Sequence, residues 1–207
     1  MWTVAQPGVC AEPPTLILAH GAGAPMDSGF MEAMAARLAA QGVNVLRFEF
    51  PYMAQRRLDG GKRPPNPAPK LLECWREVYA TVRPYVAGRL AIGGKSMGGR
   101  MASLLADELG ADALVCLGYP FYAVGKPEKP RVEHLAALKT RTLIVQGERD
   151  ALGNREAVQG YALSPSIEVL WLVAGDHDLK PLKALGFSHE QHLEAAAQGV
   201  AGFLSQD

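Results

Sequence analysis

The chain contains 207 residues, of which 48% are hydrophobic and 20% are charged, as is usual for a soluble globular protein with a sizeable core. Lysine plus arginine and aspartate plus glutamate both number 21, so the formal net charge is +0. Without a global basic field, the composition does not support binding of nucleic acid or of an anionic membrane surface. We expect one domain over residues 1–207.

The cysteines and the N-terminal segment favour a reducing, cytoplasmic setting. Cys10, Cys74 and Cys116 are odd in number, widely spaced and without a C-x-x-C pattern, so they predict neither a disulfide framework nor a zinc site. Residues 1–6 lack the features of a secretory signal, and no apolar run approaches the ~20 residues that would cross a membrane. We therefore expect a cytoplasmic protein without a membrane partner.

Short apolar runs alternate with longer helix-like segments along the chain. Strands are predicted at residues 15–19, 43–48, 89–92, 113–117, 142–146 and 167–172. Helices are predicted at residues 29–41, 70–83, 96–109, 155–161 and 188–203, with a short one at 132–138. Loops rich in proline and glycine are predicted at 51–69 and 119–129. This alternation is typical of an α/β protein, a three-layer α/β/α sandwich with a mostly parallel sheet.

Residues 94–98, Gly-Lys-Ser-Met-Gly, form a G-x-S-x-G pattern between a predicted strand and a predicted helix. In that context the pattern predicts a nucleophile elbow, which holds the Ser96 hydroxyl above the edge of the sheet. A chance match is the simplest alternative. A phosphate-binding loop is the other, but it needs glycine at position 89, where the chain has Arg89.

A nucleophilic serine needs a base, usually a histidine oriented by a carboxylate. Asp150 and His177 each follow a predicted strand, and the order Ser96, Asp150, His177 is the one expected for this kind of sheet. Glu148 is an alternative to Asp150. Asp176 and Asp178 flank His177 and also compete with Asp150, but as turn residues they could instead bond to the backbone of their own loop. The remaining histidines on or near predicted helices are interpreted as structural: His134, His189 and His192.

The developing oxyanion of an acyl-transfer reaction needs two N–H donors. The residue after the nucleophile, Met97, supplies one, and the small-residue loop at 20–24 supplies the other, for which we choose Ala22. His20 is expected to support this loop by hydrogen bonds. Tyr52, Phe121 and Tyr122 are candidate pocket walls, with core packing as the alternative.

Four segments in this order resemble the α/β-hydrolase superfamily: residues 20–23 (HGAG), 94–99 (GKSMGG), 147–150 (GERD) and 175–177 (GDH). The resemblance covers nearly the whole chain. Residues 48–53 with Arg56 and Arg57 are similar to a compact, lid-poor branch of bacterial hydrolases, related to dienelactone-hydrolase-like proteins and to the hydrolase-like domain of a chromatin-complex subunit. No insertion is large enough for a cap domain, and the first strands of the usual sheet are expected to be short or absent.

Together these observations predict a serine hydrolase that acts on a small-molecule ester, thioester or lactone without cofactor or metal. Two alternatives stay open, namely a non-catalytic scaffold with the same fold and acyl transfer to an acceptor other than water. The basic residues Arg56, Arg57, Lys62 and Arg63 either favour an acidic acyl group or lie on a solvated surface loop. The sequence predicts no particular oligomeric state.

Overall fold

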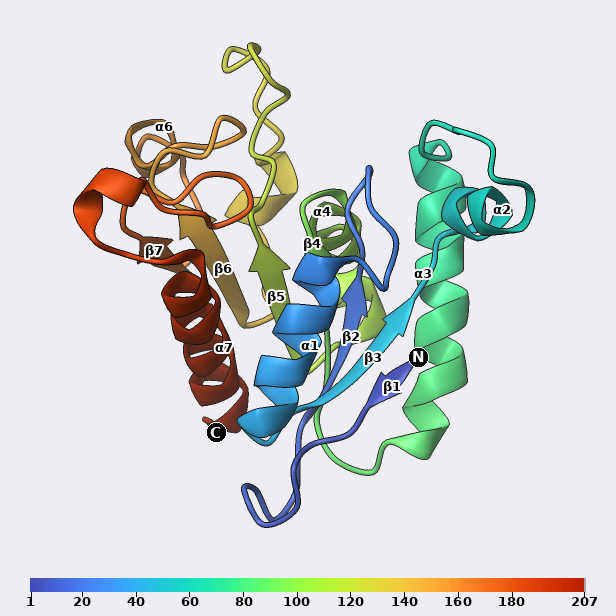
Figure 1. Ribbon diagram of the computed structural model, residues 1–207. Helices are drawn as coiled ribbons and strands as arrows, with labels where there is room; N and C mark the ends of the chain where they lie inside the picture. The colour runs from blue at the N-terminus through green and yellow to red at the C-terminus, as the bar shows by residue number, and fades with distance from the viewer. Residues whose placement is uncertain (207) are drawn as a thin grey trace.

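A seven-stranded sheet forms the middle layer of the computed structural model, which describes residues 1–206 (Figure 1). The strands follow the order β1-β3-β2-β4-β5-β6-β7 across the sheet. Only β1 is antiparallel to its neighbour, and it covers two residues at one edge. The strand bounds are β1 Trp2–Thr3, β2 Thr15–Ala19, β3 Asn44–Phe48, β4 Leu90–Lys95, β5 Ala113–Leu117, β6 Thr142–Gly147 and β7 Ile167–Leu172.

Helices cover both faces of this sheet, as the predicted sandwich requires (Figure 1). Helices α1 (Gly29–Ala40) and α7 (His189–Ser205) pack on one face. The other face carries α2 (Pro51–Asp59), α3 (Ala68–Val82), α4 (Met97–Ser103), α5 (Ala106–Leu109) and α6 (Arg155–Gln159). Three short 3-10 turns complete the elements: η1 (Arg83–Tyr85), η2 (Glu133–Ala136) and η3 (Lys183–Leu185).

Strand β2 shows how the sequence builds two cores. Its side chains are all buried, because alternate residues of a strand point to opposite faces and both faces are covered. Leu16 and Leu18 enter the core beneath α1 and α7, whereas Ile17 and Ala19 enter the core beneath α3 and α4. The near-continuous apolar runs of the strands follow from this double burial.

The prediction of a loop over residues 51–69 is wrong for its first half, where α2 begins at Pro51. Proline is tolerated at the first position of a helix, where its missing N–H needs no partner, so its presence does not exclude a helix. Gly60 ends α2 in the left-handed conformation with φ 70°. The helix predicted over 96–109 is also divided, because Leu104 and Leu105 form a turn between α4 and α5.

The segments that carry the candidate site residues lie at the carboxyl ends of the parallel strands. The segment 118–132 leaves β5, rises beyond this edge and returns through η2 (Figure 1). Within residues 1–206, no helix has the length and hydropathy needed to span a bilayer.

Candidate active site

Ser96 lies at the turn between β4 and α4, in the strand–turn–helix context that the motif predicts. Its backbone has φ 51° and ψ −116°, a conformation that is strained for a residue with a side chain. The flanking glycines allow the turn to be this tight. A Cβ on Gly94 would lie 2.6 Å from the carbonyl carbon of Gly98, and one on Gly98 would lie 2.6 Å from the carbonyl oxygen of His20.

The structure brings the side chains of Ser96, His177 and Asp150 together in one chain of hydrogen bonds. His177 Nε2 lies 2.9 Å from Ser96 Oγ, and His177 Nδ1 lies 2.8 Å from Asp150 Oδ2. Asp150 follows β6 and His177 follows β7, so all three reach this edge from different strands. The Asp150 side chain is fully buried, while that of His177 is 27% exposed and remains accessible beside Ser96.

Two further donors hold the Asp150 carboxylate. Gln146 Nε2 donates to Oδ2 at 2.9 Å, and the N–H of Leu152 donates to Oδ1 at 2.8 Å. Because an ion buried without partners is costly, these bonds allow the carboxylate to stay buried opposite His177. Sequence reasoning did not identify Gln146, although a polar residue at the end of an apolar strand was a usable signal.

Lys95 is a second functional candidate that the sequence analysis did not identify. Its side chain is 9% exposed, and Nζ donates to the carbonyl oxygen of His177 at 2.8 Å and pairs with Asp178 Oδ1 at 3.2 Å. Burial lowers the pKa of the ammonium group, and the charge of Asp178 opposes that effect. Lys95 therefore ties the loop that carries His177 to the end of β4, directly before Ser96.

The loop after β2 lies beside Ser96. A Cβ on Gly21 would lie 3.7 Å from Ser96 Cβ. His20 Nδ1 donates to the carbonyl of Gly21 at 2.7 Å and its Nε2 accepts from the N–H of Phe50 at 3.1 Å, which is the supporting role expected from the sequence. Burial lowers the pKa of this neutral imidazole. The Tyr52 hydroxyl adds a bond to the carbonyl of Ala22 at 2.8 Å.

The candidate oxyanion donors are both free for a ligand. Neither the N–H of Ala22 nor that of Met97 donates to another residue among 1–206. Ala22 lines a pocket of about 310 Å³ that also contains Ser96 and His177. Phe30 and Met31 of α1 supply the apolar part of its wall.

The interpretation of three aromatic residues as pocket walls is wrong for this pocket. Tyr52 is 3% exposed, Phe121 is 0% exposed and Tyr122 is 5% exposed, and all three belong to the core on the α3 and α4 face. None of them lines the pocket that contains Ser96. Aromatic residues in a loop pattern alone do not reveal whether the loop folds over a core, which here it does.

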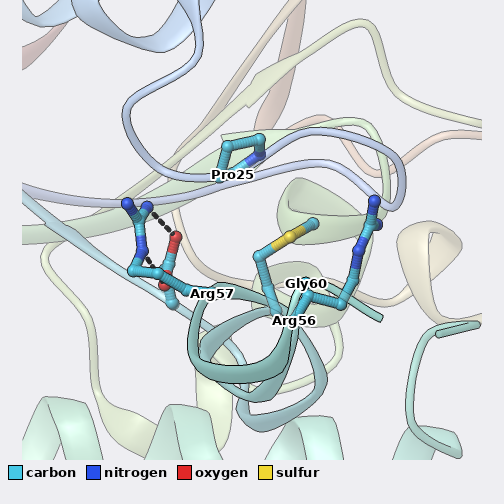
Figure 2. A pocket seen from close by; sticks show the side chains of 6 residues that line it. Pro25, Arg56, Arg57 and Gly60 are labelled. Atoms are coloured by element: carbon cyan, nitrogen blue, oxygen red, sulfur yellow. Dashed lines mark hydrogen bonds and ion pairs between the residues drawn. The ribbon is translucent and has the colours of Figure 1, made fainter. Parts of the chain in front are cut away.

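The basic residues of α2 line a separate pocket of about 240 Å³ (Figure 2). Arg57 Nη2 pairs with Asp27 at 2.9 Å and with Glu49 at 2.5 Å, and these hydrogen bonds raise the pKa of its guanidinium. Arg63 pairs with Asp59. Figure 2 shows the side chain of Arg56 pointing away from that of Arg57. Arg57, one of the four basic residues that the sequence singled out, is therefore already neutralised within the protein.

A second serine–histidine contact lies outside this pocket. Ser103 Oγ is 2.8 Å from His134 Nε2, but the serine is only 2% exposed and its hydroxyl donates to the carbonyl of Arg100. No carboxylate among the described residues bonds to the other ring nitrogen of His134. Burial lowers the pKa of His134. The contact lacks both the access and the acid that Ser96 and His177 have.

No group of three or more His, Cys, Asp or Glu side chains among residues 1–206 is arranged to hold a metal ion.

The sequence was also compared with the models of known protein families. Residues 12–205 match the family model described as an alpha/beta hydrolase domain. The chain belongs to the alpha/beta hydrolase family. This membership and the fold support a hydrolase in the broad sense.

Several solved structures share the architecture. A serine hydrolase without a lid from Xanthomonas campestris matches with a TM-score of 0.68 and 19% identity, over 96% of this chain and 87% of the other. Dienelactone hydrolase from Anabaena variabilis matches with a TM-score of 0.71 and 19% identity, over 98% of this chain and 88% of the other. Est1E from Butyrivibrio proteoclasticus, solved with ferulic acid bound, matches with a TM-score of 0.70 and 16% identity, over 100% of this chain and 96% of the other. At these identities the likeness concerns the fold alone.

Proposed function

We propose that this protein is a serine hydrolase that cleaves a carboxylic ester, thioester or lactone through a covalent acyl-enzyme. The observation that carries the proposal is the chain of hydrogen bonds from Ser96 Oγ through His177 to the buried Asp150, at 2.9 Å and 2.8 Å. The strained backbone of Ser96 and the open N–H groups beside it support the same role.

In the first half of the proposed reaction, Ser96 Oγ attacks the acyl carbonyl while His177 Nε2 accepts the hydroxyl proton. Asp150 accepts a hydrogen bond from His177 Nδ1, which selects the tautomer with a basic Nε2 and stabilises the imidazolium. The N–H groups of Met97 and Ala22 bind the negative oxygen. The bond to the leaving group then breaks, and His177 Nε2 returns the proton to that group.

In the second half, a water molecule attacks the acyl-enzyme and gives a proton to His177. The bond between the acyl carbon and Ser96 Oγ breaks, and the proton passes back to Ser96. The products are a carboxylic acid and the alcohol or thiol released earlier; a lactone gives a single hydroxy acid, because its alcohol stays attached to the acyl chain. These steps use only side chains and backbone groups of this chain, and a small acyl compound is the only partner that they need.

The test is intact mass after treatment with a fluorophosphonate probe. We expect one adduct on the wild type, none on Ser96→Ala, and the same adduct on Ser103→Ala, because Ser103 is the buried serine of the second contact. Ester hydrolysis by Ser96→Ala should fall by about 10³- to 10⁶-fold. A folded wild type that takes no adduct and hydrolyses no ester would favour a non-catalytic scaffold instead. Acyl transfer would appear as a product other than the free acid.

A further inference from the structure

Two arginines near the candidate active site have no acidic partner among residues 1–206. Most arginine side chains of this protein pair with a carboxylate, as Arg57 does with Asp27 and Glu49 and Arg76 does with Glu108. Within residues 1–206, the guanidinium groups of Arg100 and Arg131 neither form an ion pair nor donate a hydrogen bond to another residue. Both side chains are only partly exposed.

Hydrogen bonds bring the elements that carry these two arginines together. Ser103 Oγ of α4 lies 2.8 Å from His134 Nε2, and the Tyr119 hydroxyl that bonds to Arg131 lies 3.5 Å from the same nitrogen. Burial lowers the pKa of Arg100, and the positive charge of Arg131 lowers it further. The charge of Arg100 in turn adds to the effect of burial in lowering the pKa of His134. The Nε atom of Arg100 is buried and has no hydrogen-bond partner. Like charges held together with an unsatisfied buried donor are unfavourable until an anion joins them.

Tyr119 holds this arrangement in place. Its hydroxyl donates to the carbonyl of Arg131 at 3.1 Å and lies 3.5 Å from His134 Nε2. The N–H of Arg131 donates to the carbonyl of Phe121 at 2.7 Å. Arg131 is therefore fixed at its backbone, although it lies at the end of a long segment, and its side chain alone remains without a partner.

The charged residues around Arg131 in the chain are balanced, and none of them pairs with the two arginines. Lys126 and Lys129 lie in the same segment as Arg131 and form no ion pair with any described residue. The acidic residues of the same part of the chain, Glu128 and Glu133, are exposed and form no ion pair with the arginines. The charges of Arg100 and Arg131 are therefore not offset by an ion pair within residues 1–206.

The pair lies at the same edge of the sheet as Ser96. The N–H of Arg100 bonds to the carbonyl of Ser96 at 3.0 Å, one helical turn away. Helical side chains lean toward the N-terminus of their helix, so the side chain of Arg100 covers the turn that begins at Ser96. Arg131 comes from the segment that follows β5, which also leaves the sheet at this edge. Arg100 belongs to the α3 and α4 side of the sheet, whereas the 310 Å³ pocket is walled by α1.

We propose that Arg100 and Arg131 bind an anionic oxygen group, a carboxylate or a phosphate, carried by the substrate whose acyl carbon reacts at Ser96. Guanidinium groups bind such anions with paired N–H···O bonds, and two of them together select a charged substrate over a neutral one. The inference rests on the proposed hydrolase function and adds to it the charge class of the substrate.

The test compares esters that differ in charge. Phenyl acetate is the neutral reference, 4-acetoxybenzoate and 4-acetoxyphenyl phosphate carry the anion on the leaving group, and the monophenyl ester of glutaric acid carries it on the acyl group. For the wild type, kcat/KM should be higher for at least one anionic ester than for phenyl acetate. Arg131→Met should lower that preference by about 10- to 100-fold, the range for lost charge-assisted hydrogen bonds, and Arg131→Lys should lower it less.

Arg76→Met is the matched control, because it removes an exposed arginine of α3 whose partner is Glu108. It should retain the wild-type preference. A wild type that prefers the neutral ester, or a preference that survives in folded Arg131→Met, would overturn the proposal. Whether a carboxylate ester or the phosphate ester shows the larger increase in kcat/KM over phenyl acetate distinguishes a carboxylate-binding site from a phosphate-binding site.

A binding experiment tests the anion site independently of the hydrolase proposal. If the fluorophosphonate adduct and all ester hydrolysis are absent, titration calorimetry with inorganic phosphate and with glutarate still tests the arginine pair. Binding by the wild type that is lost in Arg131→Met would support the anion site. Equal binding by both proteins, or none by the wild type, would refute it.

Discussion

Replacing Lys95 by methionine tests whether this buried lysine positions His177. The substitution keeps an unbranched side chain of similar length but removes Nζ, which donates to the carbonyl of His177 at 2.8 Å and pairs with Asp178 at 3.2 Å. The methionine stem can still pack against Phe30, whose ring centroid lies 5.5 Å from Nζ. The loop that carries His177 then loses its direct hydrogen bond to the end of β4, next to Ser96.

The structure sets the size of the expected effect. A hydrogen bond from a charged donor contributes about 1.5–3 kcal/mol, while the pair with Asp178 contributes about 0–1 kcal/mol because that carboxylate is 69% exposed. Removing a buried ammonium group offsets part of this loss. We therefore expect the free energy of unfolding to fall by less than about 3 kcal/mol. A displacement of His177 by about 1 Å would lower kcat/KM by up to about 10²-fold.

The assay is kcat/KM for an ester, together with the rate of fluorophosphonate labelling and the unfolding free energy. Lys95→Met should lower both rates by about 10- to 100-fold. Asp178→Asn removes the ion pair but leaves the bond to the His177 carbonyl, so its effect should be clearly smaller. If Lys95→Met is folded and its rates stay within about twofold of the wild type, Lys95 does not position His177.

Two further predictions concern the elbow and the loop beside it. Gly98→Ala should destabilise the protein by about 1–3 kcal/mol and slow probe labelling, because its Cβ would meet the His20 carbonyl oxygen at 2.6 Å. Gly202→Ala in α7, where no atom lies within 4 Å of the added carbon, should be neutral or stabilising, and similar melting temperatures for the two variants would contradict this account. The free energy of unfolding should also fall as the pH drops below about 6.5, because burial lowers the pKa of His20 and the unfolded chain then binds more protons. Urea unfolding between pH 7.5 and 5.5 should show a shallower pH dependence for His20→Asn, and an unchanged slope would exclude this role.

The sequence predicted most of the architecture because the relevant signals are local. Apolar runs of strand length alternate with helical segments, and this alternation alone favours a parallel sheet covered on both faces. The G-x-S-x-G pattern is equally local, since it describes one turn. Chain order then connected Ser96 with Asp150 and His177, because residues that follow parallel strands meet at one edge.

The remaining features depend on contacts that only the tertiary structure creates. Ser96 and His177 are 81 residues apart, and Lys95 reaches the His177 carbonyl across 82 residues, so their distances depend on how the loops after β4 and β7 fold against each other. Arg57 is neutralised by Asp27, which lies 30 residues earlier. By the same logic, the proposed anion site depends on the fold, which brings no acid among residues 1–206 to Arg100 or Arg131. Sequence pattern indicates which residue types are present, whereas packing decides which of them keep an unsatisfied charge or an open N–H.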